Sequence, residues 1–313
     1  MNLRFVVTTL TSSLVFATAA SAAPTQPRAW VSGAGTDTVS CGTVDAPCRT
    51  FQYVHNNVVA AGGSVYVKDP ANYGQIVISK SISLINDGSG TSTIFATSGD
   101  AIDVNTDGDV LIKGLTLDGA GLGANGVSFV SPGGSLTIEN CVVRGFTSRG
   151  VSIVPSFGGS VVIVESLITG NAGAGIFTFG DGSGSLTLTL GRDRIVNNGF
   201  ESGGYGVRLT GDGAAYQFTN IESTLIAHNG IGLSVEASSS NIVSGAVFDS
   251  KLLGNSTSIK TTAGALVRLE RTSVQAAFPA GGVITNNGSI VSFGDNAIVD
   301  SVTGNAISTT TLR

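Results

Sequence analysis

The chain has 313 residues, a formal net charge of −5 and charged side chains at 12% of its positions. Such a weakly acidic, charge-poor chain is not expected to bind nucleic acid or anionic membranes, which attract basic surfaces. Its 44 glycines and single methionine, with many Val, Ile, Ser, Thr and Asn residues, favour an all-β protein with many turns.

Residues 1–22 are predicted to be a secretory signal peptide. Arg4 supplies a positive charge, residues 5–20 are mostly apolar, and small residues precede the expected cleavage site after Ala22. The remainder contains no apolar run of about 18 residues, so we expect no membrane insertion. These features predict a secreted protein, extracellular or periplasmic, and we expect it to be a monomer.

Residues 23–62 are predicted to form an N-terminal unit: a lead-in, a disulfide loop and a capping helix. Cys41 and Cys48 lie close together in a loop of an exported protein, which favours a disulfide. The alternatives are two free thiols or a metal-binding pair, but no His or Cys cluster completes a zinc site. Cys141 lies among apolar residues and is expected to be a small core residue.

A short amphipathic segment follows the second cysteine. Phe51, Val54 and Val58 fall at helical spacing, and Gly62-Gly63 ends the run. We expect a helix of about three turns that covers one raw end of the core, because exposed sheet edges invite aggregation. His55 is expected to be a solvated residue of this helix.

From residue 63 to residue 313 the chain repeats a pattern of about 25 residues. Each repeat has three short runs of alternating apolar residues, and the last run ends at a polar corner. The first run starts with glycine, and its copies are Gly126-Val127-Ser128-Phe129, Gly150-Val151-Ser152-Ile153, Gly175-Ile176-Phe177-Thr178, Gly206-Val207-Arg208-Leu209 and Gly230-Ile231-Gly232-Leu233.

Three strands and three turns per repeat predict a triangular coil, and about ten stacked coils predict a right-handed parallel β-helix. Alternation points one set of side chains inward and the other outward. The corner residues Asn171, Asn198, Asn229 and Asn255 are expected to stack and to hydrogen-bond through their side chains. A propeller blade would need a longer period, and a leucine-rich repeat would need a Leu/Asn spacing that is absent.

Four segments carry a resemblance to a known family. Three are similar to the opening of a bacterial family of secreted right-handed β-helix proteins: Ala46-Pro47-Cys48-Arg49-Thr50-Phe51-Gln52, Ala61-Gly62-Gly63-Ser64-Val65 and Ile76-Val77-Ile78-Ser79-Lys80-Ser81-Ile82. The fourth, Ser292-Phe293-Gly294-Asp295-Asn296, resembles its closing coils. The resemblance implies the fold and its capping. The broader superfamily includes pectate lyases, polygalacturonases, phage tailspikes and adhesins, so membership does not fix the function.

No complete catalytic motif is visible, so the catalytic residues are unknown. Asn105-Thr106-Asp107 resembles a polygalacturonase motif, but the Asp-Asp pair, Gly-His-Gly and Arg-x-Lys that accompany it are missing. The repeat register gives Asp107-Gly108 a different role, because it occupies the turn between the first and second strands. We therefore interpret Asp107 as a turn residue.

A recurring acid follows the second strand in several coils. Alternation places these acids outward, where stacked like charges repel unless a cation or an arginine relieves them. We expect a solvated edge balanced by Arg144, Arg194, Arg268 and Arg271 and interrupted by Arg192; the alternative is a calcium site. The acids are Glu139, Glu165, Glu222, Asp249 and Glu270.

Aromatic residues at corners are candidates for stacking on sugar rings. Phe157, Phe200 and Tyr205 fit this description best, with Tyr73 earlier in the chain. The interval from Gly175 to Gly206 is the longest, so residues 197–204 are expected to bulge outward, and long turns often carry function.

The sequence thus favours a secreted protein with a binding or structural role, which engages extracellular carbohydrate on one sheet face. One alternative is a polysaccharide lyase or glycoside hydrolase that acts on an acidic polysaccharide. Another is a surface adhesin or spike. No cofactor other than calcium is suggested.

Overall fold

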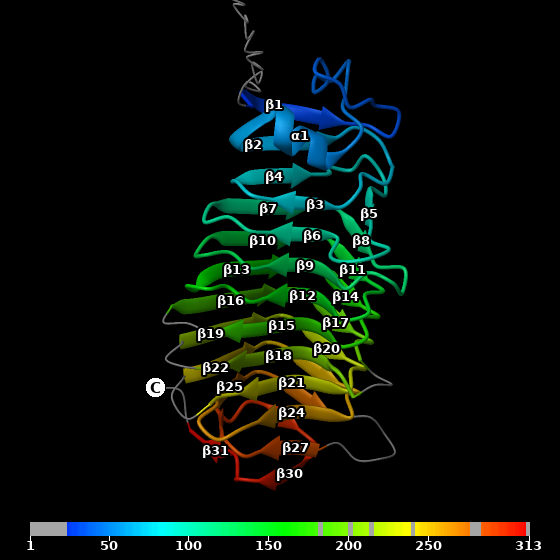
Figure 1. Ribbon diagram of the computed structural model, residues 1–313. Coiled ribbons are helices and arrows are strands. Elements are labelled where there is room, and N and C mark those ends of the chain that lie inside the picture. Colours follow the sequence, from blue (N-terminus) through cyan, green and yellow to red (C-terminus); the bar gives the residue numbers. More distant parts are fainter. Residues whose placement is uncertain are drawn as a thin grey trace, which may run out of the picture.

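The computed structural model describes residues 24–180, 184–199, 203–212, 216–238, 242–275 and 283–310. The predicted signal peptide and Phe200 lie outside these residues. The described chain forms one elongated stack of short parallel strands, with a single helix at its N-terminal end (Figure 1). No helix in this part of the chain is long and apolar enough to cross a bilayer.

Three parallel sheets form the sides of the stack. Sheet A contains twelve described strands, which are β1 (Gln26–Val31), β2 (Val59–Val67), β4 (Ile82–Ile85), β7 (Asp109–Lys113), β10 (Ser135–Glu139), β13 (Gly159–Val164), β16 (Ser185–Gly191), β19 (Tyr216–Glu222), β22 (Ile242–Phe248), β25 (Leu266–Glu270), β28 (Ser289–Ser292) and β31 (Ser308–Thr309).

Sheet C contains ten described strands, which are β3 (Ile76–Ile78), β6 (Ile102–Val104), β9 (Asn125–Phe129), β12 (Arg149–Ile153), β15 (Ala174–Gly180), β18 (Tyr205–Gly211), β21 (Ile231–Glu236), β24 (Thr257–Thr261), β27 (Val283–Asn286) and β30 (Ser301–Gly304). Sheet B contains nine, which are β5 (Thr93–Phe95), β8 (Thr116–Asp118), β11 (Val142–Arg144), β14 (Leu167–Thr169), β17 (Arg194–Val196), β20 (Leu225–Ala227), β23 (Lys251–Leu253), β26 (Ser273–Gln275) and β29 (Ala297–Ile298).

The predicted fold class is confirmed, with slightly fewer turns than the ten expected. Sheet B has the fewest described strands and therefore sets the number of complete turns. The chain makes about eight turns between β5 and β29, the first and last described strands of that sheet. At the ends of the stack, β1, β2 and β31 extend sheet A and β30 extends sheet C, without a matching strand in sheet B among the described residues. One alignment also needs correction: Val207 pairs with Leu233, so Gly206 lies opposite Gly232 and not opposite Gly230.

In-register pairing stacks like residues over one another. Leu136 pairs with Val110 on one side and with Val161 on the other, and all three are buried. Side chains that alternate with these point outward, as the exposed–buried alternation along β19 shows. The apolar core therefore runs along the axis of the stack, and the outer faces are available for function.

The predicted asparagine stack is confirmed and fully buried. The Nδ2 atoms of Asn171, Asn198 and Asn229 donate to the Oδ1 atom of the next asparagine at 2.9, 3.1 and 3.1 Å, and Asn255 ends the row. Each of these Oδ1 atoms also accepts the backbone N–H of the preceding asparagine. The neighbouring glycines are required by this packing, since a Cβ on Gly175 would lie 2.9 Å from Asn198 Nδ2.

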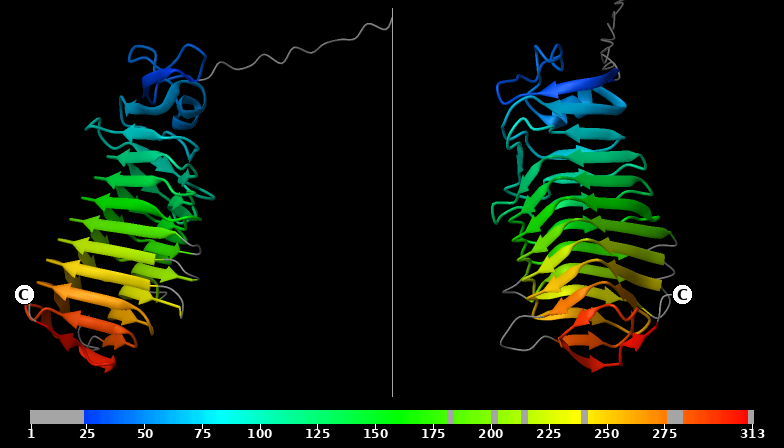
Figure 2. Two further views of the ribbon diagram at one scale, coloured as in Figure 1. Left: turned by 90° about the vertical axis from the view of Figure 1, so that its left-hand side faces the viewer. Right: turned by 180° about the vertical axis from the view of Figure 1, so that it is seen from behind.

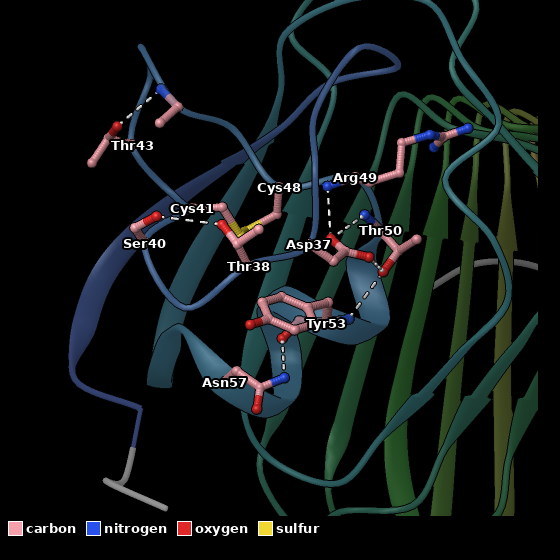
Figure 3. The surroundings of a disulfide bond; sticks show 11 residues. Asp37, Thr38, Ser40, Cys41, Thr43, Cys48, Arg49, Thr50, Tyr53 and Asn57 are labelled. Carbon is pink, nitrogen blue, oxygen red and sulfur yellow. Dashed lines mark hydrogen bonds between the residues drawn. A yellow bond between two sulfur atoms is a disulfide. The ribbon is translucent and has the colours of Figure 1, made fainter.

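The N-terminal end is closed by α1 (Phe51–Asn57), whose Phe51 and Val54 are buried. The helix has seven residues, about two turns and not the expected three, because β2 begins at Val59. Thr50 caps it by accepting from Tyr53 N–H, and Asp37 accepts from Thr50 in turn (Figure 3). The predicted disulfide between Cys41 and Cys48 is present in the same loop.

Two expectations about this end were wrong. His55 is 3% exposed, and its Nε2 accepts the backbone N–H of Ser79, so the ring joins the helix to the first coil. Burial lowers the pKa of His55, which keeps the ring neutral for this role. Tyr73 is fully buried against Phe51, with ring centroids 5.2 Å apart, and is not a surface candidate.

Removing one member of the asparagine stack should destabilise the fold. Asn198→Ala leaves the N–H of Asn171 and neighbouring carbonyls buried without partners, so the free energy of unfolding should fall by about 3 kcal/mol. Urea denaturation followed by circular dichroism measures this change. The control is Asn220→Ala on the exposed side of β19, which should have little effect; equal losses in the two variants would contradict the interpretation.

Candidate functional site on the outer face of sheet C

Outward positions of sheet C line up in columns. One column contains Asp103, Ser128, Ser152, Phe177, Arg208, Ser234 and Lys260, each in register with the next. A second column, nearer the start of the strands, contains Asn125, Arg149, Ala174 and Tyr205. Because paired strands are about 4.8 Å apart, residues in neighbouring coils are within side-chain reach.

Four of these outward residues and Glu236, the last residue of β21, form an arginine–aromatic cluster, defined here as Arg149, Phe177, Tyr205, Arg208 and Glu236. The Arg149 guanidinium carbon lies 3.8 Å from the centre of the Phe177 ring. That of Arg208 lies 5.8 Å from Phe177 and 4.7 Å from Tyr205. Guanidinium groups stacked on aromatic faces are held in place while keeping N–H donors free for a ligand.

Arg208 is further fixed by an ion pair across the next strand. Its Nε and Nη2 atoms donate to the two carboxylate oxygens of Glu236 at 3.1 and 2.8 Å, and Ser234 Oγ donates to the same carboxylate. Burial alone would raise the pKa of Glu236, but the hydrogen bonds from Arg208 and Ser234 lower it overall. The pair is therefore ionised and rigid.

Arg149 is in a different electrostatic position. It donates to Ser152 Oγ at 3.2 Å, and within the described ranges no carboxylate lies within ion-pair distance of it. Partial burial and then the nearby charge of Arg208 lower the pKa of Arg149, and the more distant charge of Asp100 opposes them. A cation that is partly desolvated and has no ion-paired carboxylate favours an anionic ligand.

Two hollows flank the cluster on the same face. A groove of about 420 Å³ is lined by Phe177, Phe179, Arg208, Thr210 and Glu236, among others. A second hollow of about 330 Å³ lies nearer the N-terminal end, where Gln52 of α1 meets Gln75, Asp100 and Asp103. The face thus offers an extended surface and not a closed pocket.

The second hollow contains two carboxyl groups. Asp100 accepts from the backbone and side chain of Asn125, at 3.1 and 2.8 Å. Asp103 Oδ1 is buried and has no hydrogen-bond partner among the described residues. Burial, and then the charge of Asp100, raise the pKa of Asp103, so this carboxyl group is the one that retains its proton more readily.

The structure describes two of the three aromatic candidates, Tyr205 and Phe157, and places them apart. Tyr205 begins β18 and belongs to the cluster. Phe157 is 68% exposed, but it follows the end of β12 and therefore lies at the opposite edge of sheet C. Within the insertion at 197–204, Gly204 N–H donates to the Gly199 carbonyl, so these two residues lie close together.

Sequence reasoning missed Phe177, Arg149 and Arg208. A signal was present, because alternation from the inward Ile176 and Val207 places Phe177 and Arg208 outward. What the sequence did not reveal is that Arg149, from the neighbouring column, reaches across to the Phe177 ring.

The predicted acidic edge is divided between two columns. Glu139, Glu222 and Glu270 end strands of sheet A, whereas Glu165 and Asp249 occupy the following turn with positive φ. Cations neutralise most of them: Lys113 lies 3.1 Å from Glu139, Arg192 lies 2.9 Å from Glu165, and Arg271 pairs with both Asp249 and Glu270. Arg192 therefore balances this edge where it was expected to interrupt it.

Nothing at this edge gathers ligands for a metal. Across the described residues, the one group of three His, Cys, Asp or Glu ligand atoms within 4.8 Å of one another is Asp37 with the disulfide-bonded Cys41 and Cys48. Calcium binding by the acidic edge stays a prediction without a coordinating cluster to support it.

Beside this edge runs a second buried polar column. Ser166 Oγ, Asp193 Oδ1, Thr224 Oγ1 and Ser250 Oγ each accept the backbone N–H of the residue one coil earlier. Asp193 is the one acid of this column and is 1% exposed. Burial raises its pKa to about 7, although the N–H groups of Ser166 and Gly191 donate to it.

Comparisons with known proteins agree with this architecture. Residues 50–220 match the family described as the right handed beta helix region, so the chain belongs to that family. No curated protein matches the chain in sequence.

Two solved structures match the chain. Pectate lyase Pel9A superposes with a TM-score of 0.63 at 16% identity, covering 92% of this chain and 80% of its own. The A-module of the mannuronan C-5 epimerase AlgE6 from Azotobacter vinelandii has a TM-score of 0.37 at 14% identity, covering 79% and 89%. At these identities the likeness concerns the fold alone.

Stability should depend on pH through Asp193. In the unfolded chain this carboxyl group ionises near pH 4, so between about pH 4 and pH 7 the folded state holds the extra proton. The free energy of unfolding should therefore fall as pH rises through this window, by up to about 4 kcal/mol, and level off above it. Denaturation at a series of pH values measures the slope.

Asp193→Ser should remove that slope, because it removes the carboxyl group that titrates. The fold should tolerate the change, because Ser166 and Ser250 occupy the equivalent positions in nearby coils. Asp107→Asn, in an exposed turn, is the control and should keep it. An unchanged slope in Asp193→Ser would refute the assignment.

Proposed function

We propose that the protein binds carbohydrate through the arginine–aromatic cluster on the outer face of sheet C. The observation that carries the proposal is the stacking of Arg149 on Phe177 and of Arg208 on Tyr205, beside an open groove. Ligand sites combine apolar or aromatic surface with a few fixed polar groups, which is the composition of this cluster. The apolar faces of sugar rings would contact the aromatic side chains, and the arginines would bind their oxygen atoms.

An acidic polysaccharide fits the cluster best. Arg149 lacks a carboxylate partner among the described residues, and a guanidinium group binds a carboxylate through two parallel hydrogen bonds. Pectate lyase Pel9A, which shares the fold, acts by its name on a polymer of this charge. The disulfide suits an oxidising compartment and supports secretion.

Phe177→Ser and Arg149→Gln test the site. Serine stands at the positions equivalent to Phe177 in β12 and β21, so the first change should be tolerated. Each variant should weaken binding to polygalacturonate or alginate by roughly tenfold, the equivalent of one lost stacking or charged contact. Affinity electrophoresis in gels that contain the polymer measures this.

The control is Thr285→Ser in β27, which lies in the same column beyond Lys260 and should bind like the parent. Binding that survives both Phe177→Ser and Arg149→Gln would rule out this site.

A second candidate function, cleavage of the bound polysaccharide, is favoured by the two carboxyl groups near the N-terminal end of the same face. Asp103 retains its proton more readily than an ordinary carboxyl group, which suits a general acid, and Asp100 stands beside it. Three strand spacings separate Asp103 from Phe177, about 14 Å, so one extended chain would reach both.

If this second function is correct, the protein releases reducing or unsaturated ends from an acidic polysaccharide, and Asp103→Asn lowers the rate at least about a hundredfold. The assay is run with and without calcium. Asp109→Asn on sheet A is the matched control and should retain the rate. Product release that is unaffected in Asp103→Asn would exclude this role.

A further inference from the structure

A second surface lies on sheet A, which faces a different direction from sheet C (Figures 1 and 2). Tyr216 and Phe218 of β19 and Ile242 of β22 all point outward, and they are 47%, 48% and 49% exposed. Tyr216 and Ile242 are direct partners in the ladder, and Phe218 lies two residues along on the same face. These three residues form one apolar patch.

The outward positions nearest the patch are uncharged, and charged side chains stand farther away, at Glu222 where β19 ends, at Asp109 in β7 and at Arg268 in β25. Through β10, β13, β16, β19 and β22, the central outward column contains Thr137, Val162, Thr189, Asn220 and Ala246. The adjacent column contains Ser135, Ser160, Thr187, Phe218 and Ser244. Across five strands these columns present hydroxyl, amide and apolar groups, on a protein whose net charge is −5.

The size of the patch argues against a protein partner. An aromatic side chain has roughly 150–250 Å² of surface, so two half-exposed aromatic side chains and the half-exposed Ile242 together offer on the order of 300 Å². A stable protein interface needs about 800 Å² from each partner. A narrow polymer that lies along the flat sheet makes use of a smaller area, and an uncharged one avoids repulsion from the acidic protein.

We propose that the outer face of sheet A binds an uncharged polysaccharide, with Tyr216, Phe218 and Ile242 stacking against sugar rings and the surrounding hydroxyl and amide groups binding sugar hydroxyls. This surface is separate from the arginine–aromatic cluster and does not depend on it. Within these five strands a charged polymer meets no counter-charge in the two columns, whereas the arginine–aromatic cluster supplies one, so we expect the two faces to select different ligands.

The repeat itself supplies the test variant. Strand β16 has Ser185 and Thr187 at the positions that pair with Tyr216 and Phe218, so Tyr216→Ser/Phe218→Thr gives β19 side chains that this sheet already accepts. Microcrystalline cellulose and insoluble chitin are the neutral probes, and depletion of the purified protein from solution gives the binding isotherm. The double variant should bind about tenfold more weakly than the parent.

Two controls isolate the patch. Leu111→Thr in β7, outside the five strands of the proposed surface, matches Thr137 in the next strand and should bind like the parent. Phe177→Ser on sheet C should also leave cellulose or chitin binding unchanged, which separates this proposal from the one for sheet C. If the double variant does not fold, the single variants Tyr216→Ser and Ile242→Thr carry the same expectation.

Three results would overturn the proposal. One is a parent protein that neither neutral polymer depletes. Another is a folded double variant with an unchanged isotherm. The third comes from sedimentation equilibrium: a dimer of the parent that the double variant loses would make the patch an interface between two copies.

Discussion

The fold depends on in-register parallel pairing along all three sheets. Each position in a coil becomes a column that runs the length of the stack, and every residue in a column meets the residues above and below it. Inward columns are apolar, as with Val110, Leu136 and Val161. Outward columns lack this constraint, so the same backbone carries a charged aromatic cluster on sheet C and an uncharged patch on sheet A.

Buried polar columns at the corners are stable because the neighbouring coil completes them. An isolated buried asparagine would leave donors and acceptors unpaired. In the row from Asn171 to Asn255, each amide supplies the acceptor that the preceding one needs. The same logic makes Asp193 the exception in its column, because a carboxylate accepts the same N–H groups but becomes buried charge when it ionises.

What the sequence could predict follows from this difference between columns. The inward alternation and the recurring corner asparagines are dictated by contacts with identical positions in neighbouring coils, so the fold and the Asn stack were predictable. The burial of His55 depends on α1 packing against the Ser79 backbone, which no repeat encodes. The contact of Arg149 with Phe177 depends on a long side chain that crosses between columns, so register alone did not reveal it.

The capping helix links stability to the candidate site. The side-chain amide of Gln52 in α1 forms hydrogen bonds with the backbone of β3, as a neighbouring strand would. It accepts from Val77 N–H at 2.8 Å and donates to the Val77 carbonyl at 3.3 Å. The same side chain lines the hollow that contains Asp100 and Asp103. The Gln52 side chain thus covers part of β3, the N-terminal edge strand of sheet C, and also lines this hollow. The N-terminal unit therefore shapes the ligand-facing surface as well as closing the core, so changes in the cap should alter that surface even where the coils are intact.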